Sequence, residues 1–102
     1  MIKIIKTKTG SAPFLFCDIC DKPVLDARLA LAATPKGQMD EQGRLEVLHV
    51  HKDTCFQVLE AKWKQPVDNI ELVRHLDFLV QNSGIELETM KEMRESYAKF
   101  GL

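Results

Sequence analysis

Two short pairs built from cysteine and histidine constrain this chain more than any other feature of its sequence. Cys17 and Cys20 form a C-x2-C pair directly after a short apolar run, and His51 and Cys55 form an H-x3-C pair after a gap of thirty residues. A tight turn between two cysteines aims both sulfurs at one point, as a tetrahedral Zn²⁺ with Zn–S distances of about 2.3 Å requires. Together the four side chains predict one closed, structural zinc site.

The number of cysteines favours a metal over disulfides. The chain has three cysteines among 102 residues, so a disulfide framework would leave one thiol unpaired. Its first residues contain no apolar stretch long enough for a secretory signal, and no run approaches the ~18 apolar residues needed to span a bilayer. We therefore expect a cytoplasmic protein with no membrane segment, in a compartment where thiols stay reduced and bind metal.

The second pair has a local structure suited to ligation. His51 is expected at the end of a strand, and Cys55 in the first turn of the helix that follows. The free backbone N–H groups of a helix start favour the thiolate form of a cysteine. His49 lies on the same predicted strand face as His51 and is the alternative nitrogen ligand, whereas His75 is expected to be an ordinary helix residue.

The first half of the chain is predicted to contain strands. Residues 2–9 alternate roughly between apolar and polar side chains, which indicates a half-exposed strand that residues 10–13 interrupt. The segment 24–33 fits either a helix or a strand. Because residues 44–51 form a good strand, we favour a second strand over residues 28–33 that pairs with it as a hairpin.

Three helices are predicted after this hairpin. The first is capped by Asp53 or Thr54 and ends before Pro66. The second spans about residues 68–84, and the third spans about residues 86–100; both have apolar side chains at helical spacing.

The first ligand pair and its surroundings resemble a known class of zinc-binding folds. Residues 17–24, with the sequence CDICDKPV, look like the zinc knuckle of treble-clef and LIM-like fingers, where C-x2-C is often followed by a small turn, Lys-Pro and an aliphatic residue. His51 and Cys55 resemble the second ligand pair at the head of the treble-clef helix. The resemblance covers about residues 14–62. The thirty-residue gap is longer than in LIM-type fingers, and H-x3-C stands where H-x2-C or C-x2-C is more usual.

These observations combine into a prediction of an α+β fold in a single domain, residues 1–102. A zinc-stabilised β-hairpin plus helix, treble-clef-like, is expected over residues 14–65. A C-terminal helical hairpin over residues 67–102 is expected to pack on it.

The predicted site favours a non-enzymatic zinc-binding protein that acts as an interaction or adaptor module. Four ligands close the zinc shell, whereas a catalytic zinc keeps an open position. Thiol redox chemistry at the C-x2-C pair is the main enzymatic alternative, because thioredoxin-like motifs also place such a pair after a strand. The C-terminal helices offer adaptable or amphipathic side chains to a protein partner or for self-association, namely Met90, Met93, Tyr97 and Phe100.

A nucleic-acid-binding regulator is the non-enzymatic alternative, because treble-clef-like fingers often bind DNA or RNA. Six lysines support it: Lys3, Lys6, Lys8, Lys52, Lys62 and Lys64. Five acidic residues oppose it: Asp18, Asp21, Asp26, Asp40 and Glu41. The formal net charge of −1 becomes more negative by one unit when three thiolates bind one Zn²⁺, so the chain lacks the excess positive charge typical of nucleic-acid binding.

Overall fold

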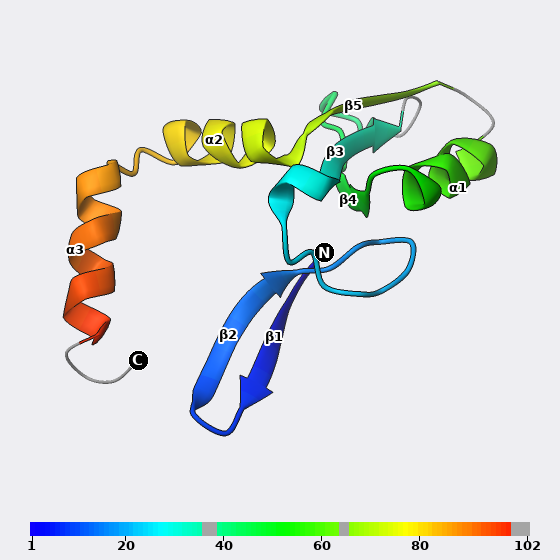
Figure 1. Ribbon diagram of the computed structural model, residues 1–102. Helices are drawn as coiled ribbons and strands as arrows, with labels where there is room; N and C mark the ends of the chain where they lie inside the picture. The colour runs from blue at the N-terminus through cyan, green and yellow to red at the C-terminus, as the bar shows by residue number, and fades with distance from the viewer. Residues whose placement is uncertain (36–38, 64–65, 99–102) are drawn as a thin grey trace.

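The described part of the chain combines two small antiparallel sheets with three α-helices (Figure 1). The computed structural model describes residues 1–35, 39–63 and 66–98. The predicted α+β class is therefore confirmed in its general form. No helix within these described ranges is both long and apolar enough to cross a membrane.

An N-terminal hairpin stands where a single interrupted strand was expected. Strand β1 (Ile2–Thr7) pairs antiparallel with β2 (Gly10–Leu15), with Thr7 opposite Gly10 at the turn. The prediction that residues 10–13 break the strand is wrong, since they belong to β2. A two-stranded ribbon leaves one edge of each strand unpaired, so Pro13 can lie in β2 although it has no N–H to donate.

The second sheet has three strands in the order β4-β3-β5. Strand β3 (Ala30–Pro35) pairs antiparallel with β4 (Leu48–His51), with Ala30 opposite His51. The predicted hairpin is confirmed, although its strands begin at Ala30 and Leu48 and not at residues 28 and 44, and the alternative of a helix over residues 24–33 is wrong. Only a short 3-10 turn, η1 (Ala27–Leu29), precedes β3.

The segment predicted to begin the second helix is a strand instead. Strand β5 (Val67–Glu71) pairs antiparallel with the free edge of β3, and helix α2 (Leu72–Asn82) begins only where β5 ends. Pairing with β3 satisfies backbone groups of this segment, and Val67 enters the core with 7% of its surface exposed. These tertiary contacts outweigh the local preference for helix.

The central strand β3 divides the core into two clusters, because successive side chains of a strand point to opposite faces. Helix α1 (Thr54–Trp63) covers one face, and α2 covers the other. The buried members of the first cluster are Cys17, Leu31, Ala33, Val50, Leu59 and Val67, and those of the second are Ala30, Ala32 and Leu72. A predicted zinc ligand, Cys17, is thus part of the apolar core.

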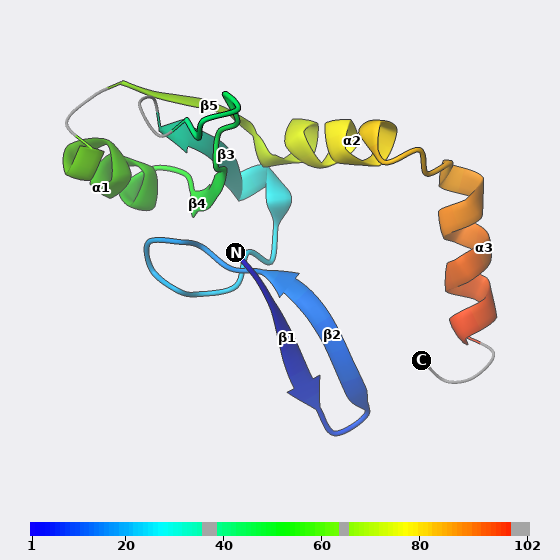
Figure 2. The same ribbon diagram turned by 180° about the vertical axis from the view of Figure 1, so that it is seen from behind.

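Helix α3 (Leu87–Ala98) extends away from the rest of the structure. It contains no buried residue, whereas α2 contributes Leu72 to the core. Figures 1 and 2 show α3 at a steep angle to α2, not side by side with it as a helical hairpin requires. Gly84, with a φ of 70°, ends α2 and lets the chain change direction there. The predicted end of this helix at Phe100 lies outside the described residues.

Candidate metal centre

The first two cysteines lie in a tight turn that follows β2. Phe16 and Pro23 form an isolated antiparallel bridge, and inside it the Cys17 N–H donates to the carbonyl of Lys22 at 2.9 Å. The N–H of Asp21 donates back to the carbonyl of Cys17 at 3.0 Å, and Asp21 takes a left-handed φ of 57°, which aspartate tolerates better than most residues. The closed turn places both cysteine side chains on one side.

The second pair lies where β4 passes into α1. His51 is the last residue of β4, and Cys55 lies in the first turn of α1. Between them Asp53 takes a left-handed φ of 63°, and its carbonyl accepts the N–H of Gln57 at 2.9 Å. Asp53 therefore occupies the N-cap position, one of the two predicted from the sequence.

The structure brings the four predicted ligands together. One nitrogen or sulfur atom from each of Cys17, Cys20, His51 and Cys55 lies within 4.8 Å of all the others. Nδ1 of His51 is 3.4 Å from Sγ of Cys20 and 3.9 Å from Sγ of Cys55. A tetrahedral zinc with bonds of about 2.3 Å to sulfur and about 2.0 Å to nitrogen sets such N···S separations at about 3.5 Å. The donor set therefore fits a single tetrahedral zinc ion.

The thiols of Cys17 and Cys55 differ in charge, and this difference also favours a cation. Burial raises the pKa of the Cys17 thiol, but the backbone N–H groups of Cys20, His51 and Ile19 outweigh burial and lower this pKa to about 6. Burial, together with hydrogen bonds to the sulfurs of Cys17 and Cys20, raises the pKa of Cys55 to about 12. The Cys17 thiolate thus keeps the neighbouring Cys55 thiol protonated. A divalent cation removes this conflict, because a coordinated thiol loses its proton.

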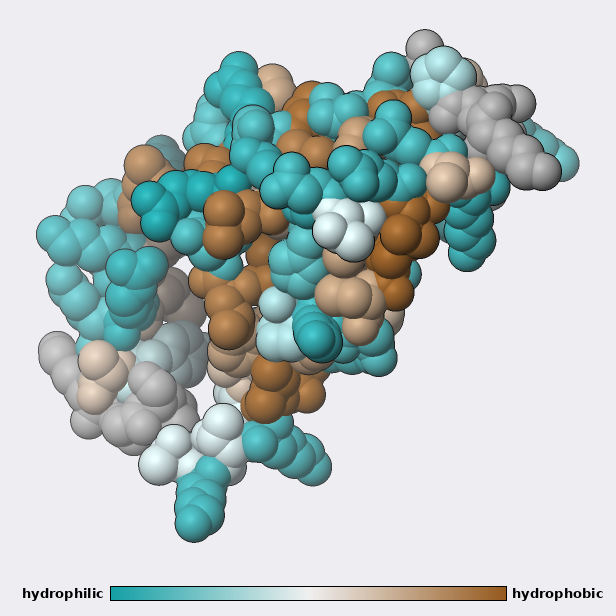
Figure 3. All heavy atoms as spheres, turned by 45° about the vertical axis from the view of Figure 1, so that its right-hand side comes forward, coloured by the Kyte–Doolittle hydropathy of each residue, from teal (hydrophilic) through white to brown (hydrophobic). Residues whose placement is uncertain are grey.

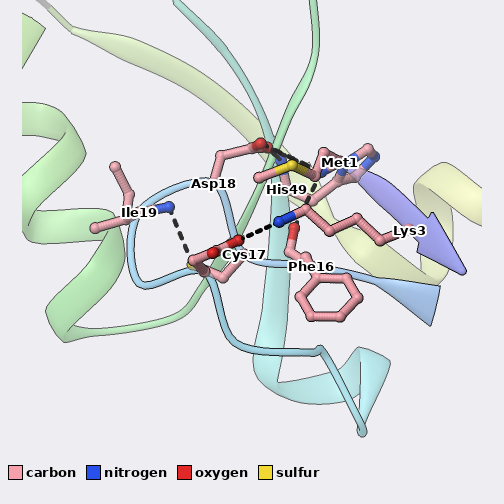
Figure 4. Close-up of polar contacts among 8 residues, drawn as sticks. Met1, Lys3, Phe16, Cys17, Asp18, Ile19 and His49 are labelled. Carbon is pink, nitrogen blue, oxygen red and sulfur yellow. Dashed lines mark hydrogen bonds and ion pairs between the residues drawn. The ribbon is translucent and has the colours of Figure 1, made fainter. Parts of the chain in front are cut away.

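His49, the alternative nitrogen ligand, belongs to a separate set of contacts (Figure 4). It is buried, its Nδ1 lies 3.2 Å from the Met1 amine, and its ring centroid lies 5.8 Å from that of His75. Burial and the nearby amine lower its pKa. His51, the last residue of β4, instead has its Nδ1 close to the sulfurs of Cys20 and Cys55. The structure therefore places His51 beside the sulfurs and His49 elsewhere.

Asp18 connects the cysteine turn to β4, a role that the sequence did not reveal. Its carboxylate accepts the backbone N–H of His49 at 2.7 Å, and its own N–H donates to the carbonyl of His49 at 2.8 Å. The same carboxylate accepts the Met1 amine at 3.2 Å (Figure 4). In the sequence, only the position of Asp18 inside the C-x2-C pair could have indicated this role.

Comparison with known proteins adds no relative from which a role for these residues could be transferred. No family model, no curated protein and no solved structure matches the chain. The functional interpretation therefore depends on the geometry and the chemistry of the four side chains themselves.

Proposed function

We propose that this chain is a small non-enzymatic zinc-binding protein in which Cys17, Cys20, His51 and Cys55 hold one structural Zn²⁺. The observation that carries the proposal is the convergence of four ligand atoms within 4.8 Å from two segments far apart in the sequence. All three cysteines are free of disulfides, so each thiol is available as a ligand. Zinc at this point would join the cysteine turn, β4 and α1.

The order of the elements supports the treble-clef-like interpretation. A cysteine turn is followed by the β3–β4 hairpin and then by α1, and ligands come from the turn and from the start of the helix. This is the arrangement that the resemblance over residues 14–62 implies. We propose the treble-clef relationship on this order alone.

Three observations support a structural role over a catalytic or redox role. Four protein ligands complete a tetrahedral shell, which leaves no position for water or substrate. Cys17 has no exposed surface, so an external thiol or disulfide cannot reach it. Asp18 to Cys20 form a turn and no helix begins at the pair, since the next helical residues are the short 3-10 turn Ala27–Leu29, whereas a thioredoxin-like dithiol begins a helix.

Metal content of the purified protein tests the proposal. Elemental analysis and native mass spectrometry should find one zinc per chain, sharply reduced in Cys55→Ser and in His51→Ala. Cobalt(II) loaded in place of zinc should show thiolate-to-metal absorption. A parent protein that purifies without metal and takes up neither zinc nor cobalt stoichiometrically would contradict the proposal.

Two other histidines provide the matched controls. His75→Ala removes an imidazole from α2 and should leave the zinc content unchanged. His49→Ala should also retain zinc, because His49 contacts the Met1 amine and not the sulfurs. Loss of zinc in His49→Ala with retention in His51→Ala would reassign the nitrogen ligand.

We further propose that the zinc-stabilised domain serves as an interaction module for a protein partner. Many large apolar side chains remain exposed, including Ile2 at 69% and Leu87 at 75%. The charges give no added support to nucleic-acid binding: Lys3 pairs with Asp21 at 2.8 Å, and Lys52 is paired with a carboxylate of β5. Lys64, also expected to contribute, lies outside the described residues.

A further inference from the structure

An apolar groove lies between the N-terminal hairpin and α2. It is a hollow of about 470 Å³ whose walls include Ile2 and Phe14 from the hairpin and Leu76 and Leu79 from α2. Ile2 and Leu79 expose 69% and 48% of their surfaces. Figure 3 shows apolar side chains gathered along this part of the molecule. The groove is therefore a surface that water covers only at a cost in free energy.

Helix α3 carries an apolar face without a partner. Leu87, Met90, Met93 and Tyr97 recur at spacings of three and four residues, which places them on one side of the helix. Their exposed fractions run from 38% for Met90 to 75% for Leu87. An exposed amphipathic helix of this kind is a typical element of helix-in-groove recognition.

The end of α2 sets the direction of α3, which buries none of its residues against its own chain. The N–H of Ser83 donates to the carbonyl of Leu79 at 2.9 Å, and the N–H of Gly84 donates to that of Gln81 at 3.4 Å. Together with the left-handed φ of Gly84, these bonds fix the change of direction seen in Figures 1 and 2. The radius of gyration, 16.0 Å, exceeds the roughly 13 Å of a compact domain of this length. A helix from another molecule can reach the groove without disturbing these bonds.

Opposite charges accompany the two apolar surfaces. The described hairpin carries Lys6 and Lys8, both exposed and neither in an ion pair within the described residues, and no acidic residue lies in β1 or β2. Helix α3 has three glutamates, Glu88, Glu92 and Glu95, against Lys91 and Arg94. The net charge of −1 on α3 therefore adds a long-range attraction to the positively charged hairpin.

We propose that α3 of a second copy of this chain packs into the groove, and that the two copies exchange their helices reciprocally. Burying one large apolar side chain removes on the order of 100–200 Å² of surface. The half-exposed side chains of one groove and one helix therefore supply several hundred Å². Two such contacts, related by a two-fold axis, bury on the order of 1,000 Å², which reaches the range of specific interfaces. A single, one-way contact buries about half as much surface and is expected to hold two chains together more weakly.

The association names a partner for the interaction role proposed above and rests on that role, but not on zinc. Sedimentation equilibrium and light scattering on the full chain test it. The parent should have the mass of two chains, and Met93→Glu in the helix and Leu79→Glu in the groove should each have the mass of one. Ser96→Glu adds the same charge to the polar side of α3 and should remain dimeric.

Mixing the two disruptive variants gives the sharper test. In a mixture of Met93→Glu and Leu79→Glu, the intact helix of the second variant can enter the intact groove of the first, so a weaker dimer should return. A monomeric parent would overturn the proposal, as would a dimeric Leu79→Glu beside a monomeric Met93→Glu, since the helices would then pair with each other. Ile2→Glu replaces Leu79→Glu if the latter loses its helical circular dichroism.

Zinc measured on the same samples keeps the two proposals separate. If a variant loses the dimer but still binds one zinc per chain, the substitution has changed the association and not the metal centre. A dimer without zinc supports association and contradicts the proposed metal centre.

Discussion

Removing the metal is the perturbation that tests the proposed centre most directly. Structural zinc sites of this type contribute on the order of 10 kcal/mol of apparent binding free energy, which is also folding free energy. Four large aliphatic side chains form the apolar part of the surrounding core: Leu31, Val50, Leu59 and Val67. At about 2 kcal/mol each, their burial contributes roughly 8 kcal/mol. Zinc is thus expected to stabilise this region about as much as its apolar contacts do.

The expected shift in melting temperature is set by ligand linkage. Free zinc at a thousand times its dissociation constant adds about 4 kcal/mol to the free energy of unfolding. For a domain of this size, each kcal/mol changes the melting temperature by roughly 4 °C or more. Chelation should therefore lower the melting temperature by at least about 15 °C.

The assay is thermal unfolding followed by circular dichroism, with and without a strong chelator, and with the zinc content measured before each scan. Amide spectra by NMR should lose dispersion from β3, β4 and α1. Cys55→Ser is the matched control, because a chain that cannot hold zinc should respond little to the chelator. A parent that loses its zinc yet melts within a few degrees of the loaded protein would refute the reasoning.

Three further outcomes can be checked. Because the pKa of Cys55 is raised to about 12, its thiol is protonated at pH 7 and must release a proton on binding zinc. Calorimetry in buffers of different ionisation enthalpy should therefore detect the release of at least one proton per zinc bound. The affinity for zinc should also fall as the pH is lowered. Asp18→Ala leaves the N–H of His49 without its acceptor and should cost about 1–3 kcal/mol in denaturant unfolding of the loaded protein, whereas Asp18→Asn, which keeps an acceptor oxygen, should cost less. Leu59→Ala empties a fully buried position and should cost about 2–5 kcal/mol, while Val58→Ala, at a half-exposed position, should change stability by less than about 0.5 kcal/mol.

The sequence was most informative where local chemistry decides the structure. Thiols and imidazole have few roles in a small chain, so the spacing of Cys17, Cys20, His51 and Cys55 was enough to predict their convergence. The start of α1 was also predictable, because a capping residue and an apolar helical repeat coincide there.

The sequence was least informative where pairing between distant segments determines the local structure. Residues 67–71 carry no strong strand pattern, and they become β5 because the edge of β3 offers backbone partners. Residues 10–13 contain the glycine and proline of a turn, yet they extend along β1 as β2. The side chain of Asp18 gained its role only from the approach of β4, which no local pattern reports.

The position of the four ligands leaves one connection of the fold free to vary in length. Ala30 lies opposite His51, so the candidate ligands hold the β3–β4 hairpin at the end where β4 leaves the sheet. Residues 39–47, the described part of the chain that leads into Leu48, enter the hairpin at the other end and contribute none of the four ligands. Doubling the length of such a connection costs only about 0.6 kcal/mol of closure entropy. Homologous chains can therefore be expected to differ most in length there, and a foreign peptide inserted there should be tolerated.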